Sequence, residues 1–113
     1  MKTVLLLASL GEGSFGVVLF AAPQLVSRLL FAADVSGVGV TVARLTGMSI
    51  FALAIACWPI GDSRSAYYGM LTWSVLAMLY LIMVRFNGIS GILLWPAVVA
   101  HSAIALLLLW SKR

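Results

Sequence analysis

The run that decides the fold is the first twenty residues after Lys2, TVLLLASLGEGSFGVVLFAA at positions 3–22, which is apolar apart from one acid. At 1.5 Å per residue, a helix of this length spans about 30 Å, the thickness of a bilayer's hydrocarbon core. The acid, Glu12, lies near the middle of the run. A carboxylate at that depth is costly unless a partner compensates it. The run therefore predicts a membrane helix whose Glu12 faces other helices.

The composition of the whole chain supports the same environment. Of 113 residues, 64% are hydrophobic and 9% are charged, against about 45–50% and about 25% in soluble domains. A chain this short cannot hide that apolar excess in one core, so we expect a single transmembrane domain over 1–113. The net charge of +4 forms no basic stripe. This pattern favours the lipid bilayer with its anionic headgroups as partner, and no nucleic acid.

Three further apolar runs, 36–59, 66–86 and 89–110, are long enough to span, and the links between runs are short. Short links make neighbouring helices antiparallel. The prediction is therefore all-α: an integral membrane four-helix bundle, up-down-up-down, with spans at 3–22, 36–59, 66–86 and 89–110. Ser36 is the expected N-cap of the second span. Segment 23–32 begins with proline and has leucines on one face, which predicts a short amphipathic helix in the interface.

The first run resembles a signal peptide, but no small-x-small cleavage site follows it, so we interpret it as a retained span. Four spans put both termini on one side of the membrane. That side carries slightly more basic residues than the other. This excess favours cytoplasmic termini for a multi-pass membrane protein. The basic residues counted are Lys2, Arg64, Lys112 and Arg113 on the terminal side and Arg28 and Arg85 on the other.

Three polar residues fall at similar depths in different spans. Counted from the side opposite the termini, Glu12 lies about 16 Å deep, His101 about 18 Å and Arg44 about 12 Å. Small residues flank Glu12 and His101 one turn away, which lets another helix approach closely. We therefore expect an intramembrane polar cluster in which Glu12 is the anion, Arg44 its counter-charge and His101 a titratable partner. A purely structural role and a ligand-binding or ion-conducting role both remain open.

Other polar residues in the spans have more local explanations. The hydroxyls of Thr46, Ser49, Tyr80 and Ser102 could extend the polar cluster, but span hydroxyls commonly bond their own helix backbone. Pro96 lies one turn before His101 and predicts a kink in the fourth span.

The remaining motifs do not indicate catalysis. Positions 11–16 match G-x-G-x-x-G, but no strand precedes them, so we interpret these glycines as a packing face. One histidine and one cysteine, Cys57, do not supply an ordinary metal-ligand set. We therefore predict no catalytic residue, no metal and no cofactor.

The segment from Pro23 to Phe31, followed by Ala43-Arg44-Leu45-Thr46-Gly47, resembles the small four-span bacterial membrane proteins grouped as DoxX-like and related uncharacterised families. In those families a glycine-containing first span precedes a Pro-Leu-rich interfacial segment and an Arg-x-x-Gly opening of the second span. The resemblance covers mainly the first half. It implies a four-helix membrane bundle in the bacterial inner membrane, in families with scattered links to respiratory or redox complexes.

For function, we expect a non-enzymatic binding or assembly module with a buried Glu-Arg-His layer, acting as a homo-oligomer or in a larger membrane complex. The alternatives are an oligomeric transporter of small molecules, ions or protons, and a membrane subunit of a quinone- or haem-linked redox complex. A purely assembly role predicts loss of assembly when Glu12 is changed. A redox subunit predicts a co-purifying pigment.

Overall fold

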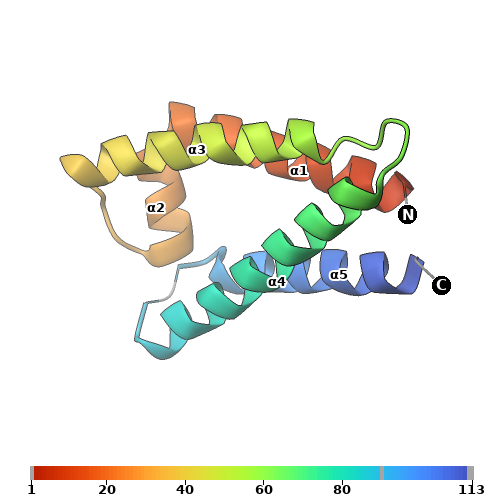
Figure 1. The fold of residues 1–113 in the computed structure, drawn as a ribbon. Helices are drawn as coiled ribbons and strands as arrows, with labels where there is room; N and C mark the ends of the chain where they lie inside the picture. Colours follow the sequence, from red (N-terminus) through yellow and green to blue (C-terminus); the bar gives the residue numbers. More distant parts are fainter. Residues whose placement is uncertain (1, 90, 112–113) are drawn as a thin grey trace.

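The computed structural model describes residues 2–89 and 91–111, and within these residues the regular structure is helical throughout. The elements are α1 (Lys2–Ala21), α2 (Pro23–Phe31), α3 (Val38–Ala56), α4 (Arg64–Phe86) and α5 (Leu94–Ser111). The predicted all-α class is thereby confirmed. Both termini lie at one end of the molecule, and α2 and the link between α4 and α5 lie at the other (Figure 1).

Helices α1 and α2 follow the predicted ranges closely, and Pro23 opens α2 as expected. Helix α3 begins at Val38, later than predicted, because Gly37 turns the chain with a positive φ of 56°. Gly37, not Ser36, is therefore the N-cap residue of α3. Helix α4 begins at Arg64, where the Asp62 carboxylate accepts the Arg64 backbone N–H at 3.0 Å. That contact satisfies one of the unpaired donors at a helix start.

Helix α5 begins at Leu94 rather than at 89, because the residues before it bind α2 instead. The backbone N–H of Gly91 donates to the Leu30 carbonyl at 2.9 Å, and that of Leu93 donates to the Leu29 carbonyl at 2.7 Å. These bonds satisfy carbonyls that a helix leaves unpaired in its last turn. The start of α5 is thereby attached to the end of α2.

The long helices associate in two pairs, α1 with α3 and α4 with α5 (Figure 1). The first pair touches backbone to backbone where Gly16 crosses Gly47. A methyl group placed on Gly16 would lie 2.6 Å from the Gly47 carbonyl oxygen, and one placed on Gly47 would lie 2.6 Å from the Gly16 carbonyl oxygen. The glycines of the first run thus include a packing position of the kind predicted.

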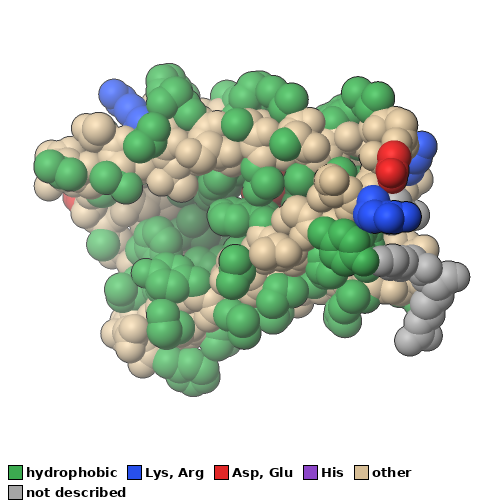
Figure 2. Space-filling model, in the orientation of Figure 1, with side chains coloured by type: hydrophobic (Ala, Val, Ile, Leu, Met, Phe, Trp, Pro, Cys, Tyr) green, Lys and Arg blue, Asp and Glu red, His purple; other side chains and the backbone are tan. Residues whose placement is uncertain are grey.

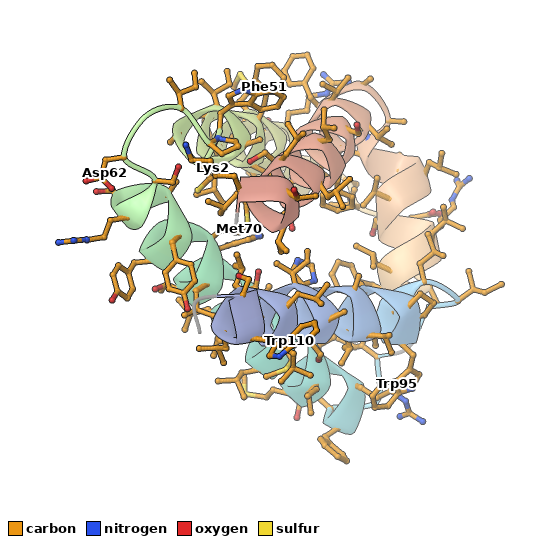
Figure 3. The ribbon with its side chains drawn as sticks, turned by 90° about the vertical axis from the view of Figure 1, so that its right-hand side faces the viewer. Lys2, Phe51, Asp62, Met70, Trp95 and Trp110 are labelled. Carbon is orange, nitrogen blue, oxygen red and sulfur yellow. The ribbon has the colours of Figure 1, made fainter. Side chains whose placement is uncertain are left out.

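Two apolar clusters hold the pairs together. One lies toward the termini and contains Met70, which points into the space between α1 and α5 (Figure 3). The other lies toward α2. Trp73 packs against both clusters and so lies between them. The first cluster consists of Leu5, Ala8, Cys57, Ala66, Tyr67, Met70 and Leu108, and the second of Leu19, Val26, Leu30 and Ile50.

The outer surface of the chain is largely apolar. Helices α1, α3, α4 and α5 are each long and apolar enough to cross a membrane. In the most apolar stretch of each helix, at most 33% of the residues are buried inside the chain. Figure 2 shows apolar side chains along the whole visible face, with most charged side chains near its two ends. In Figure 3, Asp62 and Trp95 lie on the outside of the molecule.

Candidate functional site: a buried Glu12–His101 pair

Glu12 lies on the buried face of α1, because it is spaced at helical intervals from other buried residues. Leu5, Ala8, Gly16 and Leu19 are buried and fall at positions −7, −4, +4 and +7 relative to Glu12. Residues at these intervals share one face of an α-helix. The Glu12 side chain accordingly keeps only 7% of its surface exposed.

His101 occupies the same position on α5. Leu94, Ala105 and Leu108 are buried at −7, +4 and +7, and the imidazole keeps 15% of its surface exposed. Helices α1 and α5 run in opposite directions, and the buried positions of one lie opposite those of the other. Leu5 of α1 and Leu108 of α5 share the first cluster, and a shift of seven residues on each helix leads to Glu12 and His101. The packing of the apolar residues therefore brings the polar pair together.

The structure joins the chain's only glutamate to its only histidine. The Nε2 atom of His101 lies 3.0 Å from Oε1 of Glu12, and Nδ1 lies 2.8 Å from the carbonyl oxygen of Ala97. A carbonyl can only accept, so Nδ1 carries a proton, an assignment made from its partner. The imidazole is thus oriented from both sides, and its Nε2 is directed at the carboxyl group.

Trp73 of α4 completes the surroundings of the pair. Its ring meets the imidazole edge to face, with 6.2 Å between centroids and 75° between planes. Its indole Nε1 is buried and has no hydrogen-bond partner among the described residues, and the same is true of the Ser74 hydroxyl. Ser74 lies one helical turn after Met70 of the first cluster, on the buried face of α4. The buried face of α4 therefore carries two hydrogen-bonding groups without a described partner, and one of them, the indole of Trp73, belongs to the ring that meets the imidazole.

Arg44 does not join this layer, so the predicted ion pair between Glu12 and Arg44 is wrong. Arg44 is exposed, and no described residue forms an ion pair with it; the described ion pairs are Arg28–Asp34 and His101–Glu12. The depth count started the second span at Ser36, whereas α3 begins at Val38. Gly47 lies against Gly16 and Phe20 of α1, so Arg44, three residues earlier, lies toward the Phe20 end of α1 and not level with Glu12. The buried positions of α3 are Gly47, Ile50 and Ala54, and Arg44 does not share their face.

The residues expected to support the cluster do not contact it. The hydroxyls of Thr46, Ser49 and Ser102 each donate to a carbonyl four residues earlier in their own helix. Tyr80 is exposed. Pro96 does not interrupt a helix, because α5 begins only at Leu94 and a first-turn N–H has no partner within the helix. The expected kink therefore has no basis.

The sequence prediction missed Trp73 and Ser74. A signal for Trp73 was present, because tryptophan in a span favours the ends near the headgroups, whereas Trp73 falls ten residues into α4 if Arg64 counts as the first. A tryptophan that far inside predicts contact with other helices. Nothing in the sequence pointed to Ser74 except its position next to Trp73.

Comparisons with protein-family models, with curated proteins and with solved structures find no match to this chain. The resemblance of its first half to the DoxX-like proteins therefore stays a prediction from the residues.

Proposed function

We propose that the chain is a multi-pass integral membrane protein whose four long helices cross the bilayer in up-down-up-down order. We further propose that it acts as a non-enzymatic assembly module. In this reading the Glu12–His101 pair fixes the two helix pairs relative to each other, and the outer face of α3 meets another membrane protein.

The membrane setting is supported by the outward-facing side chains. Large apolar residues of α3, such as Val42, Leu45, Met48, Phe51 and Ile55, are between 45% and 63% exposed. In water, an apolar surface this extensive drives aggregation or association. In lipid, an apolar surface is compatible with the surrounding hydrocarbon, and the helices satisfy their backbone hydrogen bonds internally.

The assembly role is supported above all by Arg44. It lies six residues into α3, about 9 Å along the helix, on an exposed surface. The chain's three acids do not compensate it: Glu12 binds His101, Asp34 binds Arg28 at 2.5 Å, and Asp62 precedes α4 at the opposite end. A charged residue in a span requires a partner or access to the headgroups. Its counter-charge would therefore come from another molecule, which we take to be an acidic side chain of a partner protein.

The membrane assignment is tested by fractionation. Membranes from cells expressing the full chain would be washed with alkaline carbonate and separately solubilised with detergent. We expect the chain to resist carbonate and to enter the detergent fraction. Recovery in the carbonate supernatant would contradict the assignment.

The assembly role is tested by particle mass. Membranes carrying the wild type, Arg44→Gln or the control Arg64→Gln would be solubilised in a mild detergent, and the native mass of the tagged particle measured. We expect a larger particle with the wild type and with Arg64→Gln, and a smaller one with Arg44→Gln. An equal mass for all three, with Arg44 reaching only headgroup phosphates, would contradict the proposal.

A further inference from the structure

We propose that Glu12 and His101 form a binding site for a single proton, shared between Oε1 and Nε2, and that this proton keeps α1 attached to α5. The proposal rests on the proposed membrane setting for the apolar surroundings of the pair. Its own evidence is the geometry of the two hydrogen bonds of His101.

The proton count follows from that geometry. Because Nδ1 faces the Ala97 carbonyl at 2.8 Å, it keeps its proton in every arrangement that preserves this bond. The contact of 3.0 Å between Nε2 and Oε1 then requires one further proton. This proton lies either on Oε1, giving neutral imidazole and carboxylic acid, or on Nε2, giving imidazolium and carboxylate. Transfer between the two atoms leaves the total charge of the pair at zero.

Loss and gain of a proton affect the contact differently. If the shared proton leaves to water, the lone pairs of Nε2 and Oε1 face each other and the layer carries a net negative charge. If a second proton arrives, an N–H still faces a carboxyl oxygen that can accept it, so the hydrogen bond persists. Burial of an uncompensated charge is costly in both cases, but only deprotonation also removes the bond.

The surrounding elements offer no compensating charge among the described residues. From α4 the pair meets the uncharged Trp73, with the cations Arg64 and Arg85 in the first and last turns. Arg44 of α3 is exposed, and Arg28 of α2 is paired with Asp34 on the surface. The buried thiol of Cys57, which follows α3, belongs to the first apolar cluster and supplies no positive charge. Because the described residues supply no compensating charge, the surroundings favour the neutral, singly protonated pair.

Thermodynamic linkage makes this proposal quantitative. Above about pH 7 in water, a free glutamate side chain is a carboxylate and a free histidine side chain is a neutral imidazole. Unfolding would therefore release the shared proton. Release of one proton raises the unfolding equilibrium constant about tenfold for each pH unit. In Glu12→Gln an amide N–H donates to Nε2 and no proton is left to release. The slope between about pH 7 and about pH 9 should then fall to that of the remaining titratable groups.

The first experiment measures unfolding of the full chain in bilayer nanodiscs over this pH range, for the wild type and Glu12→Gln. We expect the wild type to lose stability more steeply, by a difference of about tenfold in the equilibrium constant per pH unit. Equal slopes would overturn the proposal.

The second experiment needs no variant, because the chain has one glutamate and one histidine. Protein labelled with ¹³C at the glutamate carboxyl and ¹⁵N in the histidine ring would be studied by solid-state NMR in phosphatidylcholine bilayers. We expect Nδ1 to stay protonated, and Oε1 and Nε2 to lose one shared proton in a single joint step as the pH rises. Separate titration of the two groups would overturn the proposal. It would leave the membrane assignment intact, because carbonate extraction tests that independently.

Discussion

Helix α1 meets α3 and α5 in opposite ways. Against α3 it places Gly16 on Gly47, so that backbone touches backbone. Against α5 it places Glu12 on His101, so that two long polar side chains meet at 3.0 Å. Both contacts lie on the same buried face of α1, one helical turn apart.

The difference concerns what each contact tolerates. The glycine contact depends on shape, because dispersion forces are gained only at close approach, and it is independent of protonation. The Glu12–His101 contact tolerates small movements of its side chains but depends on its chemistry. A helix that combines the two can fix one neighbour permanently while its attachment to the other responds to the state of a proton.

The largest expected effect comes from breaking the glycine contact. In Gly16→Ala the new methyl group would lie 2.6 Å from the Gly47 carbonyl oxygen and 2.9 Å from the Phe51 nitrogen. Both are backbone atoms that cannot rotate away, so α1 and α3 must separate. We expect a loss of about 3 kcal/mol in the free energy of unfolding, at the upper end of overpacking effects, measured by chemical unfolding in mixed micelles.

Gly11→Ala is the matched control for this change. It lies in the same helix, and no atom beyond its chain neighbours and the nearby backbone of that helix lies within 4 Å of the added methyl group. Because alanine favours a helix over glycine by about 1 kcal/mol, we expect a small gain in stability. If Gly16→Ala behaved like Gly11→Ala, the close crossing of α1 and α3 would be wrong.

A smaller effect is expected from breaking the polar contact. His101→Leu leaves the buried carboxyl group of Glu12 without a partner, which costs about 2 kcal/mol. The second change, Glu12→Leu, removes the orphaned group, and replacing both members of a buried polar pair by apolar residues is commonly near neutral. We therefore expect the double variant to be more stable than His101→Leu alone, measured in the same micelles.

The control for this series is Ser102→Ala, which removes only a bond to the Val98 carbonyl of its own helix. We expect a change below about 0.5 kcal/mol, as for most substitutions outside a shared contact. A double variant no more stable than the single one would show that the pair is not the source of the loss.

These contacts show how far the sequence could predict the site. Hydropathy and helix rise predict the long helices and place Glu12 and His101 at a common depth, because both quantities are properties of single segments. The start of a helix and the direction that each side chain faces depend on contacts between helices. Arg44 was misplaced for both reasons, because α3 begins at Val38 and leaves Arg44 exposed. The start of α5 depends on hydrogen bonds from Gly91 and Leu93 to α2. Such bonds between segments distant in sequence leave no local pattern.

The smallest expected effect tests whether the polar contact and the Arg44 cation are independent. Glu12→Gln and Arg44→Gln should change stability additively, within about 0.5 kcal/mol, because the two side chains share no contact. Arg44→Gln alone should cost little, since Arg44 is exposed and pairs with no described residue. Unfolding of both single variants and the double variant in nanodiscs completes the cycle. Coupling well above about 0.5 kcal/mol would mean that Arg44 turns inward in a bilayer, and the pair would then no longer be neutral with a single proton. Additivity leaves Arg44 free for a partner on the outer face of α3.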